Sequence, residues 1–95
     1  MTVRKLRPQL ALHVESGVTL GSAGREEMEL TSGEHVLTLP VERGERQMRF
    51  YLPTEPRWDD NGERLPPEIA DNLQSIITEI ALFWDREPSF RSIFR

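Results

Sequence analysis

A change in hydrophobic periodicity constrains the fold of this chain more than any other feature. Up to about residue 53 apolar and polar residues alternate, as around Met48, Phe50 and Leu52, which is typical of strands with one buried face. From about residue 66, apolar residues recur at spacings of three and four, which indicates a helix with one buried stripe. The sequence therefore predicts the α+β class, with an antiparallel sheet first and a helix after it.

Short polar turns divide the first part of the chain into strands. The stretch "QLALHVE" places Leu10, Leu12 and Val14 at alternate positions, which predicts a strand that buries these three side chains. A returning arm and a meander of three further strands follow. Because connections this short favour antiparallel pairing, we expect an antiparallel meander of about four or five strands over about residues 9–53.

The second part predicts one amphipathic helix over about residues 66–86, packed on one face of the sheet. Its apolar stripe consists of Ile69, Leu73, Ile76, Ile77, Ile80 and Trp84. Pro66 or Pro67 suits the first turn, and Pro88 is expected to end the helix because the residue before a proline avoids helical geometry. The tail, residues 88–95, is compatible with a helical turn, an edge strand or a contact segment for a partner.

Composition narrows the classes of function. The 95 residues, of which 37% are hydrophobic and 29% charged, predict a single domain, residues 1–95. The net charge is −4 although Arg4, Lys5 and Arg7 make the start basic. An acidic body repels phosphates, so we expect no nucleic-acid partner and favour a basic protein partner. The chain has no cysteine and no apolar run of membrane-spanning length, so we expect a cytoplasmic protein without a membrane partner.

The linking turn, residues 54–65, contains the acids that most resemble a metal loop. With Gly62 at the central glycine position of a calcium loop, the first ligand position falls on Arg57, a cation. We therefore expect no metal site, and interpret Asn61 and Gly62 as a tight turn. Trp58 in the same stretch is either a lid on the core or an anchor for a partner.

Catalytic chemistry finds little support in the sequence. If Leu12 and Val14 are buried, alternation places His13 on the opposite, solvated face, and His35 is the only other histidine. The acids cluster in turns, where exposure does not tune a pKa. We expect no catalytic residues and no cofactor.

Four stretches resemble a known family. They are "GREEMEL", "GERQMRFYLP", "RWDDNGERLPPE" and "IADNLQSIITEIALFW", which cover about residues 20–86. Together they resemble the small bacterial immunity proteins of polymorphic toxin systems, in the family numbered seventy-four, with Trp58, Asp59 and Gly62 carrying most of the likeness. That family tends to end with a strand after the helix, a pattern from which the tail with Pro88 departs. The resemblance implies a protein that binds a cognate toxin and occludes it.

The function expected from the sequence is that of a protein-binding module, most specifically an immunity protein that neutralises a toxin, which is possibly basic. The expected contacts are the acidic residues Glu26, Glu27, Glu29, Asp59, Asp60 and Glu63, with Tyr51, Arg57 and Trp58 as anchors. One alternative is a homo-oligomeric structural or adaptor protein that uses a sheet edge or the Phe90–Phe94 tail. A second alternative is a small enzyme with an unrecognised site.

Overall fold

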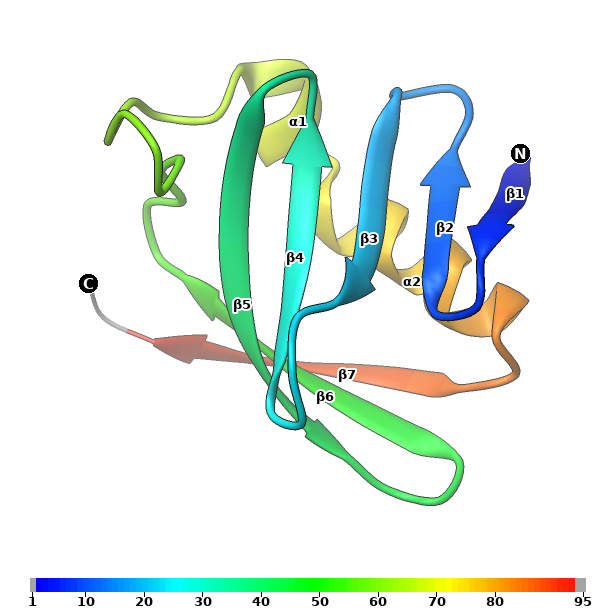
Figure 1. Ribbon diagram of the computed structural model, residues 1–95. Coiled ribbons are helices and arrows are strands. Elements are labelled where there is room, and N and C mark those ends of the chain that lie inside the picture. Colours follow the sequence, from blue (N-terminus) through cyan, green and yellow to red (C-terminus); the bar gives the residue numbers. More distant parts are fainter. Residues whose placement is uncertain (1, 94–95) are drawn as a thin grey trace.

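The computed structural model describes residues 2–93. Its elements in chain order are β1 (Val3–Arg7), β2 (Leu10–His13), β3 (Val18–Ser22), β4 (Glu27–Ser32), β5 (His35–Arg43), β6 (Gln47–Pro53), α1 (Pro67–Ala70), α2 (Leu73–Phe83) and β7 (Glu87–Ile93). The seven strands form one sheet in which each strand lies beside its neighbours in the sequence (Figure 1). All neighbouring pairs are antiparallel except β6 and β7, which are parallel. The α+β class predicted from the sequence is confirmed.

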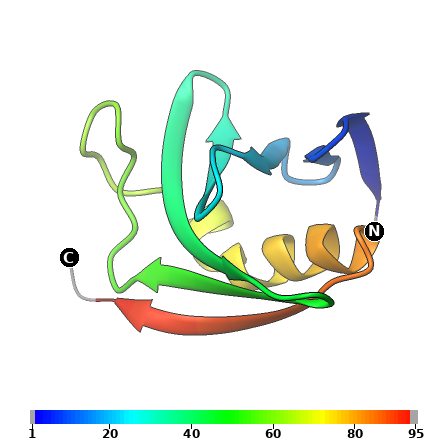
Figure 2. The same ribbon diagram turned by 60° about the horizontal axis from the view of Figure 1, so that its bottom comes forward.

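Strand β5 joins two halves of the sheet. Its first part, up to Pro40, pairs with β4, and its last part, Val41–Arg43, pairs with β6. Because β5 bends between these two pairings, the sheet curls around α2, which lies on its concave side (Figure 2). Helix α2 contacts β1, β2, β3 and β7, so strands at both ends of the sheet reach it.

The core fills the space between the concave face and α2. Phe50 and Ile77 are fully buried within it, and the ring of Phe90 stacks on Phe50 at a centroid distance of 5.9 Å. Met28, Leu30, Met48 and Leu52, which the alternating pattern places inside, are all buried. The helix stripe is buried too, apart from Trp84, which is half-buried against the core.

Two edge strands make the sheet larger than the four or five strands expected. β1 lies in the basic opening, where only Val3 is partly buried and Lys5 and Leu6 are exposed. β7 lies in the tail, of which Phe94 is outside the described residues. The edge-strand alternative for this tail is therefore the one observed, and Pro88 is tolerated because an edge strand has one unpaired side.

The prediction for β2 was wrong by one residue of register. Ala11 and His13 are buried, whereas Leu10 and Leu12 are only half-buried and Val14 is 40% exposed. A shift by one residue moves every side chain of a strand to the opposite face.

Two contacts explain this register. Ala11 is fully buried on the side that α2 contacts, where its small side chain lets the helix approach closely. On the other face, the side chain of Leu10 occupies the space above Gly21, where an added Cβ would lie 2.6 Å from Leu10 Cδ1.

The helical region also differs from the single helix expected over 66–86. The break between α1 and α2 falls at Asn72, whose side-chain amide donates to the carbonyl of Glu68 at 2.9 Å and so competes with the helical ladder. Helix α2 ends at Phe83, well before Pro88. Asp85, with φ of +58°, adopts the left-handed conformation there, and the amide of Arg86 donates to the carbonyl of Ala81 at 2.9 Å, which forms a Schellman end.

Phe50 and Phe90 test how much the parallel pair contributes to stability. We expect Phe50→Ala to lower the free energy of unfolding by about 3–5 kcal/mol, because it leaves a cavity in the core. Phe90→Ala should cost about half as much or less, because Phe90 is only half-buried. Urea denaturation measures both values, and an equal loss would show that β7 is as central to the core as β6.

Candidate functional site

The outer face of β4, β5 and β6 carries no covering layer from residues 2–93, since α2 lies on the opposite side (Figures 1 and 2). Glu27 and Glu29 are exposed on this face because they alternate with the buried Met28 and Leu30 of β4. Tyr51 lies on the same face of β6, where its hydroxyl donates to Glu42 of β5. The structure thus brings three of the nine predicted contact residues to one surface, which we call the outer face.

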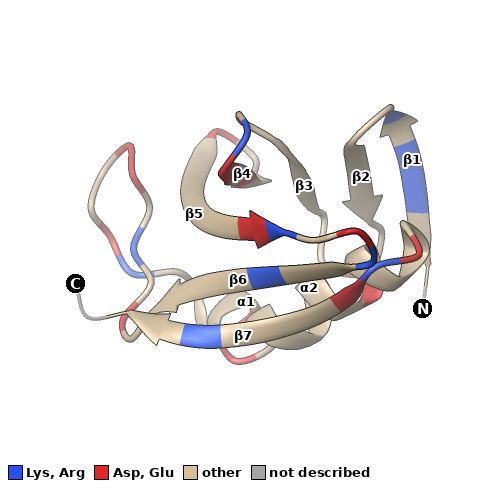
Figure 3. Cartoon of the chain, turned by 90° about the horizontal axis from the view of Figure 1, so that it is seen from below, with Lys and Arg blue, Asp and Glu red and all other residues tan. Residues whose placement is uncertain are grey.

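Most of the predicted acids on and beside the outer face keep an uncompensated charge. Within residues 2–93, Glu26, Glu27, Glu29 and Glu63 form no ion pair. Three cations of β6 and the loop are paired with other acids: Arg49 with Glu42 at 3.8 Å, and Arg57 and Arg64 with Glu55 at 3.5 Å and 3.2 Å. In Figure 3, acidic segments lie on β4, at the end of β5 and in the loop before α1.

The loop of residues 54–65 is fastened to the side of β5 that β6 leaves unpaired. The carboxylate of Asp59 accepts from the amide of Thr38 at 2.8 Å, and that of Asp60 accepts from the amide of Val36 at 2.9 Å. The amide of Asp59 donates in turn to the carbonyl of Val36 at 2.7 Å. Both aspartates are exposed, as expected, but their carboxylates replace the missing strand partner of β5.

The pKa of the Asp60 carboxyl is lowered below its ordinary value of 3.8, first by the backbone amide of Val36 and then by the side chain of His35. His35 Nδ1 lies 2.9 Å from Asp60 Oδ2. The ionised form of Asp60 therefore stabilises the attachment of the loop to β5.

Trp58 is a lid on the core and not an exposed anchor. Its side chain is 4% exposed, and its ring stacks on that of His35 with a centroid distance of 5.4 Å. Its backbone completes the turn predicted at Asn61 and Gly62, since the amide of Gly62 donates to the Trp58 carbonyl at 2.9 Å. Arg57 remains exposed beside it.

His13 is buried, contrary to the prediction of a solvated side chain, because the register of β2 turns it toward α2. Its Nε2 lies 2.6 Å from Glu79 Oε2, and its Nδ1 lies 2.8 Å from Ser16 Oγ. No local signal in the sequence marks this pair, because Glu79 lies 66 residues away in α2.

The Ser16–His13–Glu79 arrangement resembles the composition of a hydrolytic triad, but its geometry is that of a structural network. Ser16 Oγ accepts from the amide of Val18 at 3.2 Å, within the turn from β2 to β3. None of these three residues lines the cavities found in the described part of the chain. The network joins β2 to α2.

Residues 2–93 contain no group of three or more His, Asp or Glu side chains placed to hold a metal ion. No helix in this range is long and apolar enough to cross a membrane. Comparison of the chain with protein-family models, with curated proteins and with solved structures found no match.

Replacement of Glu79 tests the buried network. We expect Glu79→Ala to lower the free energy of unfolding by about 1–3 kcal/mol, because it leaves the buried His13 Nε2 without a partner. Glu79→Gln should cost less, since an amide oxygen still accepts from that nitrogen. Urea denaturation gives both values. Gln74→Ala, at an exposed position of α2, is the control. If Glu79→Ala lowers the free energy of unfolding by no more than Gln74→Ala does, the structural role of the network is contradicted.

Asp60 makes stability depend on pH with a defined sign. Because its pKa is lower in the folded than in the unfolded chain, its stabilising contribution is present above the ordinary value of 3.8 and is lost as the pH falls through the folded pKa. We expect wild type to be more stable than Asp60→Asn near neutral pH, and the difference to shrink on acidification. Urea denaturation at a series of pH values measures this. Glu63→Gln should leave the acid dependence close to that of wild type.

Proposed function

We propose that this chain is a protein-binding module whose acidic outer face engages a basic partner, and that this partner is a toxin which the module neutralises. The observation that carries the proposal is the uncovered outer face of β4–β6, together with acids that lack an ion-pair partner within residues 2–93. Unpaired carboxylates of one sign accelerate association with an oppositely charged protein and disfavour partners of like charge.

The toxin as partner is suggested by the resemblance of four short stretches to the immunity family, since no family model matches the chain. This family tends to have a strand after its helix, and β7 follows α2 in this chain. Immunity proteins of this kind act inside the producing cell, which fits the cytoplasmic location expected from the sequence.

Occlusion is the proposed mechanism. Glu27 and Glu29 would meet basic groups of the toxin. Tyr51, whose side chain is half-buried on the outer face, would supply an aromatic contact near the centre of the interface. Arg57 and Glu63 would add contacts from the loop. Trp58 would act indirectly, because its buried indole holds the loop in place instead of touching the partner.

Self-association is the second candidate, and one observation favours it. Leu82 and Phe83 at the end of α2 are 55% and 45% exposed. Pairing through the sheet edges is disfavoured, because Arg4 and Lys5 occupy edge strand β1 and Pro88 occupies edge strand β7, and charged side chains and proline oppose edge-to-edge pairing. An oligomer would therefore form through α2 more readily than through an edge.

Co-expression tests the toxin partnership. If the gene directly upstream encodes a large secreted protein with a variable C-terminal toxin domain, that domain is the partner to use, expressed alone and together with this chain. We expect the domain alone to stop growth, and co-expression to restore it with formation of a stable complex on size-exclusion chromatography. Absence of both rescue and complex would overturn the toxin-neutralising function.

Charge reversal on the outer face tests the mechanism. We expect Glu27→Lys/Glu29→Lys to lower the association rate with the partner about tenfold or more at low ionic strength, and the loss to shrink as salt screens the charges. Glu68→Lys/Asp71→Lys, with the same change of charge on α1, is the matched control. Equal rates for the two double variants would contradict the assignment of the outer face.

A further inference from the structure

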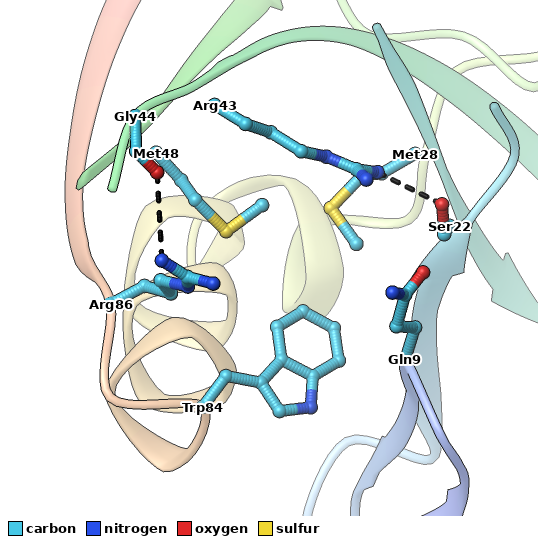
Figure 4. Close-up of a pocket in the computed structure, with 8 residues that line it drawn as sticks. All are labelled: Gln9, Ser22, Met28, Arg43, Gly44, Met48, Trp84 and Arg86. Atoms are coloured by element: carbon cyan, nitrogen blue, oxygen red, sulfur yellow. Dashed lines mark hydrogen bonds between the residues drawn. The ribbon is translucent and has the colours of Figure 1, made fainter. Parts of the chain in front are cut away.

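A cavity of about 250 Å³ opens where the two halves of the sheet separate, at the C-terminal end of α2. It is lined by Gln9, Ser22, Met28, Arg43, Gly44, Met48, Trp84 and Arg86. These residues come from the β1–β2 turn, the ends of β3 and β5, the starts of β4 and β6, and the connection from α2 to β7 (Figure 4). No sequence motif marks the cavity, because its residues meet only when the sheet has curled.

Two arginines at the cavity are held in place by neutral oxygen atoms. Arg43 donates to the hydroxyl of Ser22 at 2.9 Å and to the carbonyl of Gly24 at 3.2 Å. Arg86 donates to the carbonyls of Gly44 and Glu45. Neither guanidinium forms an ion pair with a carboxylate of residues 2–93, although acids outnumber Lys and Arg by 16 to 12. Two fixed, unneutralised guanidiniums beside one cavity favour an anion.

The rest of the lining is apolar. The indole of Trp84 lies along one side of the cavity, and the thioethers of Met28 and Met48 lie between it and Arg43 (Figure 4). Met28 and Met48 are buried and Trp84 is half-buried. A flat indole and adaptable methionine side chains favour contact with an apolar group, which a simple inorganic anion would not supply.

The backbone around the cavity adopts an uncommon conformation. Among residues 2–93, Gln9 and Asp85 are the only non-glycine residues with positive φ, at +63° and +58°. Gln9 lines the cavity, and Asp85 lies between Trp84 and Arg86 and sets the direction in which both leave the helix end. Asp85 is the left-handed residue that ends α2, so Gln9 is the one whose conformation no helix end explains, and such conformations are frequent at binding sites.

We propose that this cavity binds a small organic acid with an apolar body. The carboxylate would lie against Arg43, whose planar donor group matches its two oxygens, and Arg86 would add positive charge from the other side of the cavity (Figure 4). The apolar body would rest on Trp84, Met28 and Met48. The cavity is small and open on one side, which suits an aryl or branched aliphatic monocarboxylate better than a nucleotide. This inference does not depend on the toxin partnership.

The experiment uses phenylacetate as the probe and the two indole N–H signals in proton–nitrogen correlation spectra as the readout. We expect a saturable shift of the Trp84 signal at millimolar phenylacetate, while the Trp58 signal stays in place because it is buried in the distant loop. Phenylacetamide, which has the same body without the charge, should bind at least about tenfold more weakly because one charged contact is lost. Inorganic phosphate, which has charge without an apolar body, should also bind at least about tenfold more weakly, because it makes no contact with the apolar lining.

Two variants test the arginines. Arg43→Gln and Arg43→Gln/Arg86→Gln should weaken phenylacetate binding about tenfold or more. Arg64→Gln/Arg91→Gln, with the same loss of charge at two exposed positions outside the cavity, should not change it. The single variant serves if the double variant does not fold. Absence of a Trp84 shift, equal binding of phenylacetamide or phosphate, or unchanged binding by Arg43→Gln would each overturn the proposal.

Discussion

The architecture depends on the bend in β5. Because one strand pairs with β4 in its first part and with β6 in its last, the two halves of the sheet face each other across α2. The concave side must then be apolar, and the convex side stays in contact with solvent. The same bend leaves the first part of β5 without a neighbouring strand on one side, where the carboxylates of Asp59 and Asp60 accept hydrogen bonds from its backbone amides. The bend also separates the strand ends that line the arginine cavity.

Local alternation was sufficient to predict the central strands and the buried stripe of the helix. From Glu27 to Thr31 in β4 and from Gln47 to Leu52 in β6 the inward positions are large and apolar and the outward ones are polar, so the pattern has a single interpretation. In β2 both faces carry apolar residues, and the choice depends on Gly21 and Glu79, which are remote in sequence. β1 and β7 gave no alternation, because edge strands bury little and are defined by their pairing.

The sequence was sufficient to predict which acids of the candidate site are exposed, but not which other residues the side chains of the site contact. Glu27 and Glu29 follow directly from the alternation of β4, and they remain free to meet a partner. The roles of Asp59 and Trp58 depend on where the loop packs. Asp59 binds the backbone of β5, and the ring of Trp58 stacks on that of His35. Arg43 and Arg86 lie far apart in the sequence, and no motif surrounds either of them. Only the folded chain shows that they share one cavity.

The parallel pairing of β6 with β7 has a consequence for folding during synthesis. The five antiparallel connections that precede it are local, so the sheet from β1 to β6 can assemble as the chain emerges. β6 then keeps an open edge, with Phe50 lacking its stacking partner Phe90, until β7 has left the ribosome and paired. During that interval the nascent chain exposes an unpaired strand beside an incomplete core, which is the form most vulnerable to aggregation.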